Sequence, residues 1–344
     1  MEQELTTSSD MNVPQSDKQS LAGLLEGAHD ALEKFDNDTA RQLLTEAVTK
    51  YPDNEKALFE LGYFLYEEGE IQNAEVLLKQ SVQLGPEKNA KKYFTLAQIA
   101  TDPSDVLGLY TKGLHIVLGK IQQLKQHQTI AEDYEEKMQK LKRLAAQGFC
   151  GLAQLEATNA GPYFESFDGA RFLEYIKQSL EIDSSYLEAY SQLALYYFNI
   201  QDEMSCRKTL AELVAKVKEM EEQGNGDLSD YGPQFFVPIV RMMIEGEIWD
   251  DGIYLMEIGL QSEGKDFEGN YMYAFCLFQA EEYDQAAEVC QEMEKLGIMK
   301  SGDEELIQGF VELKQEIETA VKNLPAEEHR VKTPDSENDW IDDN

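Results

Sequence analysis

Residues 57–86, ALFELGYFLYEEGEIQNAEVLLKQSVQLGP, decide the fold, because they repeat the pattern of residues 23–52, GLLEGAHDALEKFDNDTARQLLTEAVTKYP. The two copies are 34 residues apart, and residue size is kept at six paired positions. The pairs are Leu24 and Leu58, Ala28 and Gly62, Ala40 and Ala74, Leu44 and Leu78, Ala47 and Ser81, and Pro52 and Pro86. Self-similarity at this period indicates a stack of helical hairpins.

The residue types suit two antiparallel helices in close contact. Small residues such as Ala28 and Gly62 let the helices approach, and leucines fill the space beside them. Pro52 and Pro86 lack a backbone donor and end the second helix of each unit, while Gly69 suits the turn between the helices. These are the signature positions of the tetratricopeptide repeat.

Weaker copies follow along the chain. A third unit has a shortened turn at residues 101–104 and contains Tyr93, Leu96, Ala97, Val106, Tyr110 and Gly113. Another unit contains Tyr190, Leu193, Ala194, Tyr197, Cys206 and Leu210, and the last contains Ala274, Leu277, Ala286 and Cys290. Between them, Gly252, Met256 and Gly259 indicate a second helix whose partner begins near Pro238. We expect about seven units.

The expected fold class is an all-α tetratricopeptide-repeat superhelix, an α-α solenoid, over residues 19–324. Helical periodicity outruns a standard unit over residues 117–157, which predicts unusually long central helices. Apolar residues three or four apart in residues 302–324 predict a C-terminal capping helix. Residues 158–167 and 222–233 read as loops. We expect residues 1–18 to be a mobile N-terminal segment and residues 325–344 an acidic mobile tail.

The charge balance restricts the partners. The chain of 344 residues has 66 acidic and 30 basic residues, a formal net charge of −36. Such a field repels nucleic-acid phosphates and anionic headgroups and favours a basic protein partner. No apolar run approaches the roughly 20 residues that span a bilayer, and the start lacks the features of a secretory signal. We therefore predict no direct nucleic-acid binding, no membrane association and no small-molecule substrate.

Residues for catalysis or metal binding are sparse. The histidines His29, His115, His127 and His329 are far apart, and none belongs to a zinc-protease motif. The four cysteines lie in apolar helical stretches without the spacing of a zinc or redox site. No phosphate-binding loop or nucleophile elbow is present. We predict that the chain is not an enzyme, with no catalytic residue, no metal and no cofactor.

The first helix of each unit is expected to line a concave surface suited to binding a polypeptide. Aromatic rings interleaved with carboxylates favour a segment that carries Lys or Arg among apolar residues. The alternative is that several of these rings belong to the core between repeats. The predicted partner-binding groove contains Phe59, Tyr63, Tyr66, Glu67, Phe94, Gln98, Glu188, Leu195, Asn199, Glu268, Tyr271 and Phe275.

One well-known use of tetratricopeptide repeats, the binding of acidic chaperone tails, does not fit this sequence. Repeat domains that hold the acidic C-terminal tails of heat-shock chaperones use Lys, Arg and Asn on the first helices. Here the corresponding positions are Leu25 and His29 in the first unit and Glu60 and Tyr63 in the second. An acidic tail would be repelled from this surface.

Three segments carry a more specific resemblance: residues 57–62 (ALFELG), 92–98 (KYFTLAQ) and 110–114 (YTKGL). With them, the chain resembles the eukaryotic assembly chaperones dedicated to large-subunit ribosomal protein four. The tail with Trp340 among aspartates is similar to the acidic ends of that family, and the specific part of the resemblance covers residues 21–119. Membership would imply a chaperone that shields its newly made, basic client in the concave trough and escorts it into the nucleus.

Three hypotheses follow. The first is a dedicated chaperone that binds and shields a large-subunit ribosomal protein, present in cytoplasm and nucleus, and supports its delivery to ribosome assembly. The second is an acidic histone-binding tetratricopeptide-repeat chaperone, although such proteins usually carry a long acidic insertion and basic import clusters. The third is a scaffold subunit of a multiprotein complex, for which apolar patches on the second helices would be diagnostic.

Overall fold

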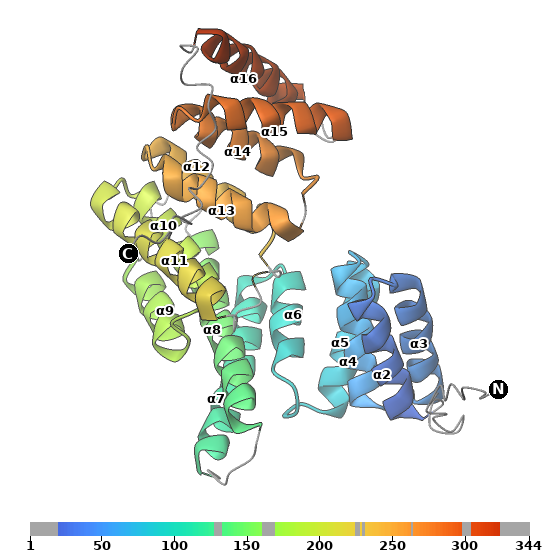
Figure 1. The fold of residues 1–344 in the computed structure, drawn as a ribbon. Coiled ribbons are helices and arrows are strands. Elements are labelled where there is room, and N and C mark those ends of the chain that lie inside the picture. The colour runs from blue at the N-terminus through green and yellow to red at the C-terminus, as the bar shows by residue number, and fades with distance from the viewer. Residues whose placement is uncertain are drawn as a thin grey trace, which may run out of the picture. The chain divides into compact units, whose positions relative to one another are not determined.

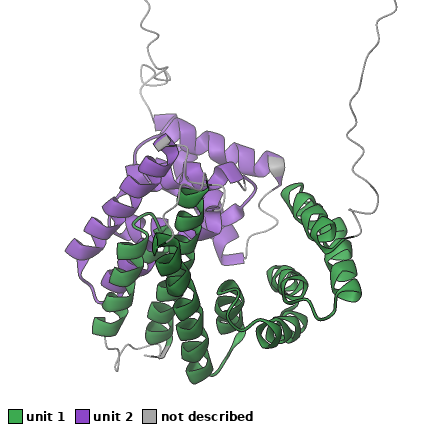
Figure 2. Cartoon of the chain, turned by 90° about the horizontal axis from the view of Figure 1, so that it is seen from below, with its two compact units in different colours: residues 1–189 green, residues 190–344 purple. Residues whose placement is uncertain are grey.

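The computed structural model describes residues 20–126, 133–159, 169–223, 228, 231–262, 264–297 and 304–323. The chain forms two compact units, residues 1–189 and residues 190–344, which Figure 2 shows in separate colours. The regular structure of the described residues consists of fifteen α-helices and contains no strand. The all-α prediction is therefore confirmed.

Unit 1 contains four helical hairpins. Consecutive helices pack against one another as α2–α3, α4–α5, α6–α7 and α8–α9, and Figure 1 shows their order along the chain. The first two hairpins coincide with the two copies of the repeat. The helices are α2 (Leu21–Glu33), α3 (Asn37–Lys50), α4 (Glu55–Glu67), α5 (Ile71–Leu84), α6 (Lys91–Ile99), α7 (Pro103–Gln126), α8 (Tyr134–Asn159) and α9 (Gly169–Ile182).

Unit 2 begins within the next helix. Its hairpins α12–α13 and α14–α15 pack in sequence, and the last helix, α16, packs on α14 and α15 as the expected capping helix. Counting α10 and α11 as a pair, the described helices make seven pairs followed by α16. These helices are α10 (Leu187–Asn199), α11 (Glu203–Gln223), α12 (Pro233–Glu245), α13 (Trp249–Ser262), α14 (Phe267–Gln279), α15 (Tyr283–Leu296) and α16 (Glu304–Asn323).

The signature positions form the core of the first two hairpins. Ala40 and Ala74 are completely buried, and Leu58 and Leu78 are nearly so. A Cβ atom added at Gly62 would lie 3.1 Å from Cγ of Leu78, so a small residue is needed where α4 crosses α5. The size pattern found in the sequence therefore reflects close helix packing.

The turns inside most of the hairpins share one backbone conformation. Five of them contain a residue with positive φ: Phe35, Gly69, Gln201, Glu247 and Glu281, with φ between 54° and 77°. The hydrogen bond that closes a helix end of this kind recurs as well, from the amide of Asp36 to the carbonyl of Ala31 at 2.9 Å and from Glu70 to Leu65 at 2.8 Å. Of these five residues, only glycine favours positive φ by its residue type.

Two other expectations about the elements have clear outcomes. The long central helices are confirmed, since α7 has 24 residues and α8 has 26. The helix expected to begin near Pro238 begins instead at Pro233, so that prediction was wrong. Proline suits the first helical position, whereas Pro238 lies inside α12 and removes only the backbone donor that would reach Gln234.

A buried lysine joins the second and third hairpins. Lys92 of α6 is fully buried, and its ammonium donates to the carboxylate of Glu55 at 2.7 Å. It also donates to the carbonyls of Gly85 at 2.6 Å and Ser81 at 3.1 Å, at the end of α5. These acceptors satisfy the charge and cap the helix, which makes burial of the lysine tolerable.

Several sequence predictions lie outside the described residues. Residues 1–18 and 325–344, including Trp340, are not described, and the predicted loops at 158–167 and 222–233 are described only in part.

Candidate functional site: an acidic and aromatic groove

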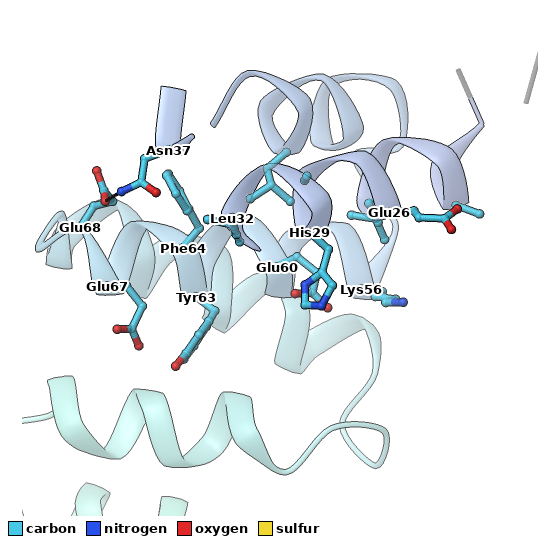
Figure 3. A pocket seen from close by; sticks show the side chains of 14 residues that line it. Glu26, His29, Leu32, Asn37, Lys56, Glu60, Tyr63, Phe64, Glu67 and Glu68 are labelled. Atoms are coloured by element: carbon cyan, nitrogen blue, oxygen red, sulfur yellow. Dashed lines mark hydrogen bonds between the residues drawn. The ribbon is translucent and has the colours of Figure 1, made fainter. Parts of the chain in front are cut away.

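A groove of about 540 Å³ lies in unit 1, where α2 and α4 run beside each other. We call it the first groove. Figure 3 shows Glu60, Tyr63 and Glu67 extending from α4, with the imidazole of His29 beside Glu60. Its lining residues are Ala22, Leu25, Glu26, Ala28, His29, Leu32, Asn37, Leu44, Lys56, Glu60, Tyr63, Phe64, Glu67 and Glu68.

Carboxylates dominate the polar lining of the first groove. Four glutamates face one lysine, and one of them, Glu68, already accepts a hydrogen bond from Asn37 and pairs with Arg41 at 3.5 Å. Burial raises the pKa of Glu60, and the nearby cations of Lys56 and of Lys91 on α6 partly oppose that rise. The groove is therefore an anionic site with an apolar floor, suited to a basic segment that also carries apolar side chains.

Aromatic rings continue from the groove along α4. The ring centroids of Phe59 and Tyr63 are 5.9 Å apart, and those of Tyr63 and Tyr66 are 6.3 Å apart. The ammonium of Lys91 lies 3.6 Å from the centroid of Tyr63, within the range of a cation–π contact. Burial raises the pKa of Tyr66, so its hydroxyl stays neutral over the ordinary pH range.

The structure separates the predicted groove residues of unit 1 into two groups. Tyr63 and Tyr66 are half-buried, and Glu67 and Gln98 are exposed on the first helices of their hairpins. Phe59 and Phe94 are 5% and 1% exposed, so the prediction that they line a groove was wrong. Both rings fill the core between hairpins, which is the alternative reading for these aromatics.

Three further candidates lie on α10. Glu188 is half-buried, Asn199 is exposed, and Leu195 is 49% exposed. Asn199 also lines a separate groove of about 680 Å³ in unit 2, together with residues of α11 and α12. Their exposure is compatible with partner contact, and their role remains a prediction.

The candidate groove residues on α14 contact side chains or backbone of neighbouring helices. Glu268 pairs with Arg241 of α12. The hydroxyl of Tyr271 lies against Gly309 of α16, and the ring of Phe275 stands 6.4 Å from that of Trp249. These side chains are half-buried, so they contribute to helix packing as well as to the surface.

Sequence reasoning missed a charged row on α4. Lys56, Glu60, Tyr63 and Glu67 follow one another at spacings of four, three and four residues, so they share one helix face. The prediction instead took Phe59, Tyr63, Tyr66 and Glu67 as the inward-facing positions of this helix. Phe59, Tyr63 and Tyr66 are also four and three residues apart, so helical periodicity alone did not assign Glu60 to the groove and Phe59 to the core.

The described residues offer no cluster of three or more His, Cys, Asp or Glu arranged to hold a metal ion. The cysteines are buried and free, and burial raises the pKa of Cys150 and Cys276 to about 12 and that of Cys290 to about 11. These thiols stay protonated at neutral pH, the unreactive form. Within the part of the chain that is described, no helix has the length and apolarity to cross a membrane.

Comparison with known proteins agrees with this fold. Residues 31–98 match the family model described as tetratricopeptide repeat. The fold is the all-α tetratricopeptide-repeat fold. A solved structure described as "Assembly Chaperone of RpL4 (Acl4)" aligns with a TM-score of 0.60 at 19% identity, covering 78% of this chain and 99% of that chain.

A curated relative is also similar. The chain is 26% identical over 247 residues to the Schizosaccharomyces pombe protein named "Probable assembly chaperone of rpl4". The match covers 70% of this chain and 68% of the relative. This sequence match confirms the resemblance to this group of chaperones that residues 21–119 indicate, and the solved structure shows the shared fold.

Proposed function

We propose that the chain is a dedicated, non-enzymatic chaperone that holds a newly made large-subunit ribosomal protein, ribosomal protein L4, and supports its delivery to ribosome assembly. The observation that carries this proposal is the similarity to the curated rpl4 chaperone over 70% of the chain. The net charge of −36 and the anionic first groove support it independently, because ribosomal proteins are basic.

The physical role of the charge is capture and protection. A basic ribosomal protein outside the ribosome binds stray RNA or aggregates. A negative field accelerates its association with the chaperone, and the groove then covers basic and apolar segments together. Ribosomal RNA presents a denser array of negative charge than the groove, so transfer to RNA releases the client. This role requires presence in both cytoplasm and nucleus, which is part of the proposal.

Affinity purification at moderate salt tests the function. The full chain is tagged, and proteins that remain bound are identified by mass spectrometry. The proposal expects one unassembled ribosomal protein, L4, without the rest of the large subunit. Recovery of histones, or of a stoichiometric multisubunit assembly, would contradict it and favour the histone-chaperone or scaffold hypothesis.

A charge-reversal pair tests the site. Glu67→Lys and Glu188→Lys should each weaken capture of L4 several-fold, because each puts a repulsive cation on the predicted binding surface. Glu75→Lys is the matched control, since it makes the same change in net charge on α5, the second helix of its hairpin. Equal loss of binding in all three variants would mean that only net charge matters and that the groove is misplaced.

A further inference from the structure

Lys91 is a half-buried cation without a salt bridge to any described residue. Its ammonium stands 3.6 Å from the ring centroid of Tyr63, at the first groove's edge. Burial lowers its pKa, and the negative charges of Glu67 and Glu60 oppose that change. The ring face of Tyr63 is therefore the direct contact of this charge within the described chain.

Glu60 is the complementary half-buried anion. It lines the first groove, and its carboxylate makes no hydrogen bond or ion pair with a described residue. The titratable groups that face it are Lys56 on its own helix, His29 on α2 and Lys91 on α6, with Glu55 as a more distant anion. Glu60 and Lys91 carry opposite charges and are both partly removed from water at the same surface, yet they form no ion pair.

Such an arrangement is unfavourable for the isolated protein. Removing a charge from water is costly unless a close partner compensates, and a direct pair between Glu60 and Lys91 would be the simplest compensation. Instead, the Lys91 ammonium covers a ring beside two carboxylates, where an external cation would also bind best. A lysine side chain has four flexible methylene groups and moves without any change in the backbone.

We propose that Lys91 is a built-in occupant of a cation site formed by Tyr63, Glu60 and Glu67, and that a lysine or arginine of the bound protein displaces it. The identity of that protein rests on the proposed function, whereas the site itself does not. An incoming cation must displace the ammonium of Lys91, so a single Lys or Arg side chain gains little binding free energy at this site. The site therefore favours segments that make further contacts with the protein, because those contacts supply the rest of the binding free energy.

Two lysine variants separate this site from simple charge counting. Lys91→Gln empties the site, and Lys79→Gln removes the same charge from an exposed position on α5, outside the groove lining. The probe is a fluorescein-labelled peptide of alternating Lys and Ala, titrated with the full chain and followed by anisotropy. We expect Lys91→Gln to tighten binding about threefold to tenfold and Lys79→Gln by less than about twofold. Equal effects of the two variants would overturn the proposal, as would no effect of Lys91→Gln.

A double-mutant cycle gives a second readout. Tyr63→Leu removes the ring face. Lys91→Gln should therefore not increase the affinity for the peptide when it is introduced into the Tyr63→Leu variant. Circular dichroism and thermal unfolding of each variant establish that the fold is kept. A gain that persists without the ring would contradict the cation site.

The peptide measurement and the purification experiment fail independently. If the full chain does not capture ribosomal protein L4 while the contrast between Lys91 and Lys79 persists, the proposed function is wrong and the cation site stands. If L4 is captured and the contrast is absent, the function stands and the displaced-lysine mechanism is wrong.

Discussion

Phe35 combines an unfavourable backbone with an unusual exposure. It has φ of 57°, and 93% of its surface is accessible at the turn between α2 and α3. Thirty-four residues later the same position is Gly69, for which positive φ carries no steric penalty.

This comparison gives a stability prediction at position 35. Phe35→Gly should be more stable than Phe35→Ala by about 1 kcal/mol, because both remove the exposed ring and only glycine relieves the left-handed backbone. Chemical denaturation of the two variants measures the difference. If alanine proved as stable as glycine, the turn would have relaxed and the strain would be absent.

Glu60 gives a pH-dependent prediction. Burial raises its pKa in the folded state, so the ionised carboxylate lowers the free energy of unfolding at neutral pH. The destabilisation disappears as the pH falls through the raised pKa, because the carboxyl group of Glu60 becomes protonated. Glu60→Gln should therefore increase the melting temperature at pH 7, with a smaller difference near pH 4. A melting temperature that drops at pH 7 would show instead that the attraction to Lys56 and Lys91 outweighs burial.

At the scale of helices, sequence periodicity predicted the helix pairs correctly. It did not predict which aromatic rings are buried or where α12 begins. The pairing of residues 34 apart predicted the first two hairpins, since small residues must lie where helices cross. Burial of Phe59 and Phe94 was not predictable from residue type, because a ring suits either a core or a binding surface. Pro238 was misleading because proline marks a helix start in sequence but is tolerated inside α12.

Two glycines of α7 test the role of close approach. A Cβ at Gly113 would lie 2.4 Å from the ring of Phe94, whereas one at Gly119 would meet nothing within 4 Å. Alanine favours a helix over glycine by about 1 kcal/mol at either site. We expect Gly119→Ala to stabilise the chain by up to about that amount and Gly113→Ala to destabilise it, because the buried ring cannot move freely. Thermal and denaturant unfolding compare the two, and stabilisation by both would mean that Phe94 has room to shift.

For the molecule as a whole, the net charge of −36 sets how binding depends on salt. Raising NaCl from about 50 to about 300 mM shortens the screening length several ångströms, which weakens long-range attraction first. We expect the affinity for ribosomal protein L4 to fall at least about tenfold, mainly through a slower association rate. Stopped-flow association and dissociation rates separate the two contributions. A loss carried mainly by faster dissociation would place the electrostatics in short-range contacts.

The principal contacts of the described helices join each helix to its neighbour or to the next but one, as in α2 with α4 and α4 with α6. Helices with such partners are completed in the order in which the polypeptide is made. Once α7 has emerged from the translating ribosome, Glu60, Tyr63 and Lys91 already have the neighbours described above. One end of this protein is thus equipped to fold, and to complete its groove, during its own synthesis.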